Sequence, residues 1–244
     1  MPLVDDDKAD RLERPGAGGR TPDRSYSGVG EPTTDTPFQV RRYGAFARAN
    51  HWVTAASLIL LAISGLALFH PSLFWMTGLF GGGQNTRALH PWIGVLLFFS
   101  FALLFVQFWR ANLWRREDTV WVSKIGDVLQ NKEENLPELG KYNAGQKFVF
   151  WSMSLLIIGL IVTGIAIWEQ YFAWAVPIPA QRLAVIAHSA LAIFAISVWI
   201  VHVYASIWVQ GTMSAMVSGR VTGGWAWRHH RKWLRDLVAS KKTA

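Results

Sequence analysis

The chain has 244 residues, of which 51% are hydrophobic and 16% are charged, and the apolar residues fall in long uninterrupted blocks. Such blocks favour an all-α membrane protein surrounded by lipid over one or two soluble domains. The net charge of +8 does not indicate a nucleic-acid partner, because Lys and Arg cluster outside the apolar blocks. Since cysteine is absent, disulfides, thiolate-held iron–sulfur clusters and covalently attached haem are excluded.

Residues 1–38 are rich in Asp, Arg, Gly, Pro, Ser and Thr and show no apolar period, which predicts a disordered tail. They also lack the continuous apolar core of a signal peptide, so we expect the N-terminus to remain in the cytoplasm. We therefore divide the chain into this tail, a four-helix transmembrane domain over 39–218 and a basic cytoplasmic segment over 219–244.

Four apolar segments follow the tail, at 51–69, 91–109, 148–168 and 183–209. At ~1.5 Å per residue, a helix of about 19 residues covers roughly 28 Å, close to the ~30 Å thickness of the hydrocarbon layer. We therefore predict a bundle of four transmembrane helices. Several tryptophans at the segment ends suit the depth of the lipid headgroups: Trp52, Trp75, Trp92, Trp109, Trp168 and Trp208.

Basic residues are distributed unevenly among the loops. They are frequent before the first segment, between the second and third, and after the fourth, whereas the other two loops carry only Arg87 and Arg182. Cytoplasmic loops are the ones enriched in Lys and Arg. We therefore expect a multi-pass protein of the bacterial inner membrane, with both termini and the middle loop in the cytoplasm.

Four of the seven histidines lie in or at the mouths of the apolar segments: His51, His90, His188 and His202. His188 and His202 are 14 residues apart, so they face the same side of one helix, roughly 21 Å from each other. The expected orientation puts His90 level with His188 near the periplasmic surface, and His51 level with His202 near the cytoplasmic surface. Two level-matched pairs predict the ligands of two haem b irons, one at each side of the membrane.

Three other interpretations of these histidines remain open. A proton relay favours a staggered chain with carboxylates between the histidines, and the four segments contain no Asp or Glu. A zinc site requires more ligands at one level. Purely structural histidines are the third alternative.

Residues near the four histidines fit the haem interpretation. Ala55, Gly94 and Ala192 lie one turn after a histidine and Gly65 lies 14 residues after His51, which leaves room for a porphyrin, although helix packing also selects small residues. Arg48 and Arg87 each precede a histidine by three residues. They can pair with haem propionates or simply extend to the headgroups. The remaining histidines are expected to be solvated surface residues: His70, His229 and His230.

Residues 140–147 read GKYNAGQK, just before the third segment. Together with the histidine spacing, this string resembles the gamma subunit of respiratory membrane-bound formate dehydrogenase, over about residues 38–238. The resemblance implies four transmembrane helices, a C-terminal cytoplasmic helix and the same pairing of histidines. The long N-terminal tail departs from that family.

The resemblance also implies partners. These are an iron–sulfur beta subunit that delivers electrons to the periplasmic haem and a catalytic alpha subunit that oxidises formate, and a higher oligomer of this heterotrimer stays open. Because the chain has neither a flavin fingerprint nor iron–sulfur ligands, we expect electrons to come from such a partner. The alternatives are the cytochrome b subunit of a nickel–iron hydrogenase or thiosulfate-type reductase and, in another class, a haem-free transporter or anchor.

Finally, the resemblance implies that a quinone, either menaquinone or ubiquinone, binds beside the cytoplasmic haem at His202, Asn143, Gly145 and Gln146. The residue types alone leave two interpretations. Asn143 and Gln146 can hydrogen-bond a quinone carbonyl, or Asn143 can cap the third helix while Gly145 relaxes its start.

Overall fold

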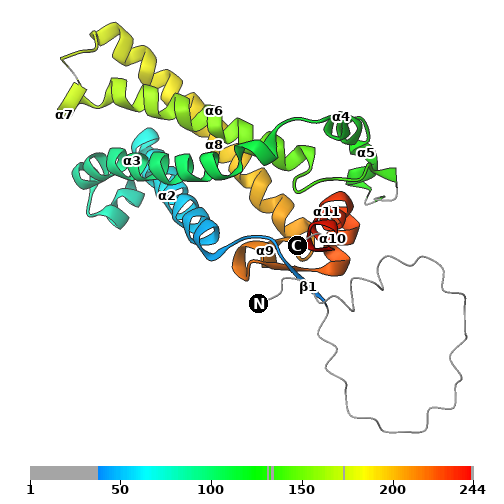
Figure 1. The fold of residues 1–244 in the computed structure, drawn as a ribbon. Coiled ribbons are helices and arrows are strands. Elements are labelled where there is room, and N and C mark those ends of the chain that lie inside the picture. Colours follow the sequence, from blue (N-terminus) through cyan, green and yellow to red (C-terminus); the bar gives the residue numbers. More distant parts are fainter. Residues whose placement is uncertain (1–37, 131, 133–134, 173, 243–244) are drawn as a thin grey trace, which may run out of the picture.

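The computed structural model describes residues 38–130, 132, 135–172 and 174–242, which are mostly helical (Figure 1). All but the last residue of the predicted tail lies outside the described residues. Four long helices are each apolar enough to cross a membrane, which confirms the predicted fold class. They are α2 (Ala45–Phe69), α3 (Gly83–Phe108), α6 (Ala144–Ile167) and α8 (Ile178–Trp208).

Each of these helices begins before the apolar segment that predicted it. α2 starts at Ala45, so His51 lies in its second turn, and α3 starts at Gly83, so Pro91 lies inside it. Hydropathy detects only the part of a helix that contacts lipid and not its polar first turns. The predicted start of a span at Pro91 was therefore too late.

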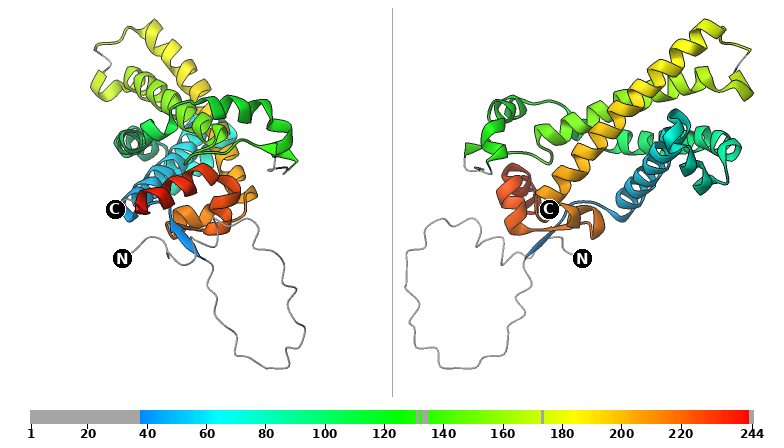
Figure 2. Two further views of the ribbon diagram at one scale, coloured as in Figure 1. Left: turned by 45° about the vertical axis from the view of Figure 1, so that its right-hand side comes forward. Right: turned by 180° about the vertical axis from the view of Figure 1, so that it is seen from behind.

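The long helices form two pairs. α2 packs along α3, and α6 packs along α8, and the two pairs meet where α3 contacts α6 and α2 contacts α8. Beyond this crossing the pairs diverge toward their connectors, the 3-10 helix η1 (Pro71–Phe80) and the short α7 (Glu169–Phe172) (Figure 2). At Gly159 an added Cβ would lie 2.9 Å from Leu191, so a small residue is needed where α6 meets α8.

A partly buried polar network joins α2 to α3. The Asn50 side-chain amide donates to the Ser100 backbone carbonyl at 2.8 Å, and the Ser100 hydroxyl lies 2.9 Å from Asn50 Oδ1 and 2.6 Å from Thr54 Oγ1. Interhelical hydrogen bonds of this kind hold transmembrane helices together, since lipid offers no hydrophobic gain for their contact. They fix α2 and α3 beside His51.

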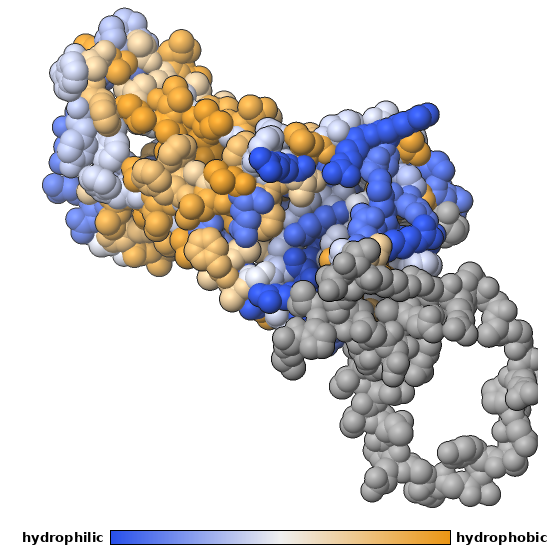
Figure 3. All heavy atoms as spheres, in the orientation of Figure 1, coloured by the Kyte–Doolittle hydropathy of each residue, from blue (hydrophilic) through white to orange (hydrophobic). Residues whose placement is uncertain are grey.

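Apolar residues cover the outside of the helices rather than a central core. Many large hydrophobic side chains are exposed along them, whereas hydrophilic residues gather beyond the apolar helices, most of them at the right-hand end of the molecule (Figure 3). The small buried cluster Leu58, Leu97, Met153 and Ile157 lies where the two pairs meet. This outward apolar face is the surface expected of a bundle solvated by lipid.

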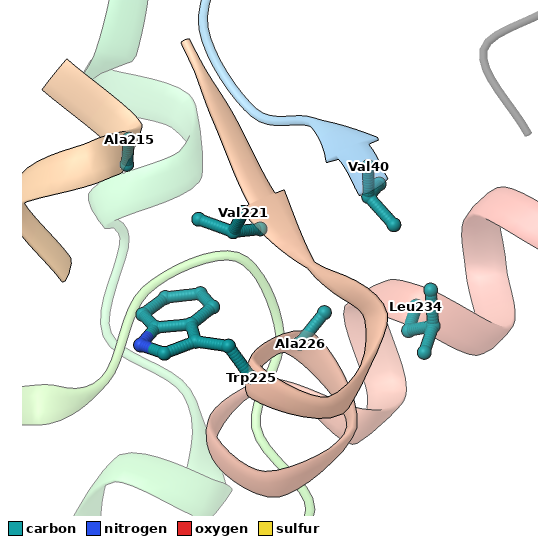
Figure 4. Packing of buried hydrophobic residues seen from close by; sticks show 6 residues of the cluster. All are labelled: Val40, Ala215, Val221, Trp225, Ala226 and Leu234. Carbon is teal, nitrogen blue, oxygen red and sulfur yellow. The ribbon is translucent and has the colours of Figure 1, made fainter. Parts of the chain in front are cut away.

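The hydrophilic end is a separate packed layer, which we call the polar cap and which comprises the described residues of 38–44, 109–143 and 209–242. Its strand β1 (Gln39–Arg41) pairs antiparallel with β2 (Arg220–Thr222), across the predicted boundary at 218/219. Val40, Val221, Trp225, Ala226 and Leu234 form its core with Ala215 (Figure 4). The other elements are η2 (Trp109–Asn112), α4 (Arg116–Ser123), α5 (Ile125–Leu129), α9 (Thr212–Val217), α10 (Gly223–His229) and α11 (Arg231–Lys242).

Arg42 joins three segments of the polar cap. Its side chain donates to the Lys141 carbonyl at 2.5 Å and lies 3.3 Å from His230 Nε2, while His230 Nδ1 donates to the Gly140 carbonyl at 2.7 Å. The guanidinium also lies 4.9–5.7 Å from the centroids of four aromatic rings, which stabilise a buried cation. Those rings belong to Tyr43, Tyr142, Trp225 and Trp233.

His230 is therefore buried, and the prediction that it is a solvated surface residue was wrong. The sequence shows a basic segment around it but not the tertiary contact with Arg42. Burial and the adjacent Arg42 charge lower the pKa of His230 well below its usual value, and the same two causes lower the pKa of Lys141 to about 8. His70, by contrast, is exposed, as predicted.

A buried ion pair fixes the middle loop to the start of α6. Lys147 Nζ lies 2.6 Å from Asp118 Oδ2 and donates to the Leu113 carbonyl, and the side chains of Lys147 and Asp118 are 4% and 0% exposed. The same carboxylate accepts a hydrogen bond from the Arg115 backbone N–H. The segment that precedes α6 is thereby held in place.

We predict that Lys147→Ala lowers the free energy of unfolding by about 3–5 kcal/mol, because it leaves the Asp118 carboxylate buried without its partner. Denaturant titration of the purified protein measures the change. Lys232→Ala is the matched control, since its ion pair with Glu117 is partly exposed and contributes about 0–1 kcal/mol. Equal effects of the two substitutions would contradict the assigned role of the buried pair.

We predict that the polar cap loses stability as the pH falls below about 6.5, the ordinary pKa of histidine. Folded His230 has the lower pKa, so unfolding takes up a proton in this range; the stabilisation is complete above 6.5 and is lost as the pH falls toward the folded pKa. Hydrogen exchange of β1 and α10 as a function of pH measures it. His230→Gln, which cannot titrate, should remove this pH dependence, and an unchanged profile would refute the assignment.

Candidate functional site

The four predicted ligands form two pairs. His90 on α3 and His188 on α8 have ring centroids 6.3 Å apart, and His51 on α2 and His202 on α8 are also 6.3 Å apart. The second pair lies at the polar-cap ends of its helices, and the first lies toward η1 and α7. The pairing predicted from depth is therefore the pairing seen in the fold.

The spacing within each pair suits one shared metal ion. An imidazole–metal bond of about 2.0–2.1 Å, with about 1.1 Å from ring centroid to nitrogen, puts two such rings about 6.3 Å apart. Two rings joined by a direct hydrogen bond would have centroids only about 5 Å apart. The described residues contain no group of three or more His, Cys, Asp or Glu side chains that could hold a metal. Two ligands per site suit haem, whose porphyrin supplies the other four nitrogens, better than zinc.

In the pair His90/His188, a hydroxyl from the neighbouring helix fixes each ring. Ser64 Oγ on α2 lies 2.7 Å from His90 Nδ1, and Thr163 Oγ1 on α6 lies 2.9 Å from His188 Nδ1. Each hydroxyl donates its own proton to the carbonyl four residues earlier in its helix, at 2.7 Å. The oxygen therefore accepts from the imidazole Nδ1–H, which leaves the Nε2 lone pair free to bind a metal. The His188 ring also has a hydrogen bond with the Leu160 backbone carbonyl, one turn before Thr163 on α6.

Each of these hydroxyl residues is followed by a glycine against which the ring rests. An added Cβ at Gly65 would lie 3.4 Å from His90 Cε1, and one at Gly164 would lie 3.5 Å from His188 Cε1. A Cβ at Gly94, one turn after His90, would meet no atom within 4 Å. Packing between helices therefore does not require a glycine at position 94, whereas a bulky group bound beside His90 would.

The pair at the polar cap has a different environment. His51 is half-buried and its Nδ1 is buried without a hydrogen-bond partner, and His202 is exposed. No hydrogen-bond partner for the His202 ring is found within the part of the chain that the structure describes. The two pairs thus share their spacing but differ in what holds the rings.

The predicted propionate partners differ from one another. Arg48 donates to the Val217 carbonyl at the end of α9, and its Nε is buried without a partner. Arg87 is exposed on α3. The structure thus gives Arg48 a contact that sequence reasoning did not foresee, while one of its donors remains available.

The predicted quinone residues lie at the start of α6. Asn143 Oδ1 accepts from the Gln146 backbone N–H at 2.8 Å, and Gln146 Oε1 accepts from the Asn143 backbone N–H at 3.1 Å, so the two form a capping box. An added Cβ at Gly145 would lie 3.4 Å from the Trp121 ring. The capping interpretation therefore describes their geometry, and both side-chain NH₂ groups remain free to donate. Among the described residues, no hydrogen bond joins this segment to His202.

Residues 42–219 match the family model described as prokaryotic cytochrome b561. The chain belongs to this family. Membership implies haem b as the cofactor, and the two histidine pairs are the groups suited to hold it.

The chain is 44% identical over 196 residues to the formate dehydrogenase cytochrome b556(fdo) subunit of Escherichia coli, covering 80% of this chain and 92% of that protein. It is 37% identical over 211 residues to the formate dehydrogenase cytochrome b556 subunit of Haemophilus influenzae, with 86% and 88% covered. It is 38% identical over 190 residues to the nitrate-inducible cytochrome b556(Fdn) subunit of formate dehydrogenase from Escherichia coli, with 78% and 88% covered. The predicted resemblance is confirmed.

Sequence reasoning missed Ser64 and Thr163, although a signal for them was present. Residues 64–67 read Ser-Gly-Leu-Ala and residues 163–166 read Thr-Gly-Ile-Ala, so each first helix of a pair carries a hydroxyl residue followed by glycine. The match between the two strings is too short to stand out in the sequence. The fold places Ser64 and Thr163 each beside a histidine, so the cytochrome repeats one arrangement of hydroxyl, glycine and histidine.

Proposed function

We propose that this chain is the di-haem cytochrome b subunit of a membrane-bound formate dehydrogenase. It would carry electrons from a periplasmic iron–sulfur partner to a membrane quinone on the cytoplasmic side. The observation that carries the proposal is the pair of histidine sites stacked along one bundle, His90/His188 and His51/His202, each with the spacing of a shared metal ion. The chain covers 88–92% of the length of relatives that are named as formate dehydrogenase subunits, which supports formate dehydrogenase as the enzyme that donates the electrons.

The charge distribution supports an orientation with the polar cap in the cytoplasm. The sequence segments at the opposite end, 70–90 and 168–187, contain no basic residue except Arg87 and Arg182. Loops retained in the cytoplasm of bacteria are the ones rich in Lys and Arg. The cap carries most of the basic residues, among them Arg41, Arg42, Arg115, Arg116, Lys124, Lys141, Arg220, Arg228, Arg231, Lys232 and Arg235.

The chain's own residues hold and isolate the redox groups. Two haem b groups bound at the pairs would supply one-electron carriers, one toward each surface of the membrane. The imidazoles hold and orient them, and the apolar helices exclude water and carry no Asp or Glu that would favour a proton relay. The catalytic alpha subunit would oxidise formate, and the periplasmic iron–sulfur beta subunit would pass the electrons to this chain, which has no cysteine to ligate a cluster of its own.

At the cytoplasmic end, Asn143 and Gln146 would bind the quinone. Their oxygens are engaged in the capping box, but their side-chain NH₂ groups can donate to a quinone carbonyl. Reduction of the quinone to the quinol takes two electrons and two protons, and we infer that these protons come from the cytoplasm. His202, exposed on α8, and Gly145 would complete the site.

We predict that His90→Ala removes one of two haems from the purified complex, since no neighbouring side chain can replace the imidazole. A reduced-minus-oxidised absorbance spectrum with a haem-to-protein ratio measures the loss. His70→Ala is the control, because this exposed histidine lies outside both pairs and should keep both haems. A colourless wild-type protein, or full haem content in His90→Ala, would overturn the proposal.

We predict that Asn143→Ser slows quinone reduction while both haems and the stability are kept. Serine caps a helix about as well as asparagine but lacks the NH₂ donor. Formate:quinone turnover, haem content and thermal stability are compared with those of Asn143→Ala, which also loses the cap, at a cost of about 1 kcal/mol. Normal turnover in Asn143→Ser would show that Asn143 serves the helix alone.

A further inference from the structure

The hydroxyls of Ser64 and Thr163 act on the electronic state of the rings that they hold. In each hydroxyl the single proton goes to the carbonyl of its own helix, Leu60 for Ser64 and Gly159 for Thr163, so the oxygen accepts from the histidine. A hydroxyl that already donates is polarised and becomes a stronger acceptor. Both bonds therefore draw the Nδ1 proton away from the imidazole ring.

This contact changes the opposite nitrogen. When Nδ1–H is strongly hydrogen-bonded, electron density shifts toward Nε2, which makes the ring a more basic metal ligand. A more basic ligand stabilises oxidised iron more than reduced iron, and such hydrogen bonds are one of the means by which proteins set haem potentials. Oxidised and reduced haem iron differ by one electron, so the effect appears directly as a lower reduction potential.

The effect is confined to one pair. His51 Nδ1 is buried without a partner, and His202 has none within the described part of the chain. Ser64 is 0% exposed, and both hydroxyl residues lie inside long helices rather than in loops, so their positions follow from the packing of α2 on α3 and of α6 on α8.

We propose that Ser64 and Thr163 are positioning residues that fix the Nδ1–H tautomer of His90 and His188 and lower the reduction potential of the haem held between them. This inference rests on the proposed function. It assigns to these residues a role in setting the potential of one haem separately from the other.

The test is a redox titration of the complete complex, followed in the haem α-band, with a chemical mediator as the electron source. In Ser64→Ala and Thr163→Val we expect one of the two midpoint potentials to move to a more positive value and the other to stay unchanged, with two haems retained. Electron paramagnetic resonance of the oxidised protein should show altered g-values for that haem only. Thr163→Ser, which restores the hydroxyl, should return the potential toward that of the wild type.

Ser154→Ala is the matched control. Ser154 is a buried serine of α6 that donates to the Phe150 carbonyl and, among the described residues, has no hydrogen bond with a histidine, so its substitution should leave both potentials unchanged. Unchanged potentials in both test variants, a negative shift, or an equal shift in the control would overturn the inference. Loss of the haem from both variants would show that the hydroxyls retain the group and would also overturn it. A wild-type complex without haem absorbance would instead refute the proposed function.

Discussion

An imidazole placed among apolar helices has two nitrogens, and burying either of them without a hydrogen bond or a bound metal costs free energy. One nitrogen of His90 and one of His188 are engaged by the hydroxyls of Ser64 and Thr163, and the paired rings stand 6.3 Å apart, too far for a hydrogen bond between them. A metal between the rings, as proposed above, would give the remaining nitrogens a partner. The spacing of the rings and the glycines beside them fit that proposal.

The helices are brought to this spacing in two pairs rather than as one symmetric bundle. In each pair the first helix presents a hydroxyl residue and a glycine to a histidine on the second helix. The Asn50, Thr54 and Ser100 network fixes one pair, and the close approach at Gly159 fixes the other. Hydrogen bonds and small residues replace the hydrophobic effect here, since lipid is as apolar as the helices it surrounds.

The polar cap holds the ends of the same helices through an apolar core and buried charged groups, which are the interactions of a water-soluble fold. It has its own apolar core and a buried Arg42 surrounded by aromatic rings, and it ties the N-terminal strand to the middle loop and the C-terminal helices. Lys147 and Asp118 attach the middle loop to α6. The segment with Asn143 and Gln146 is thus held rigidly at the end of the bundle where His51 and His202 also lie.

The sequence by itself determined the fold class, the four spans and the pairing of the histidines, because hydropathy, helix geometry and loop charge each depend on residue order alone. It also contained the string at 140–147 that indicated the family. Only the tertiary structure decided that His230 is buried against Arg42, that β1 joins β2, and that Ser64 and Thr163 support one pair of histidines and not the other. These are contacts between segments 25 to 188 residues apart, and such contacts depend on which helix faces meet, which no local pattern specifies.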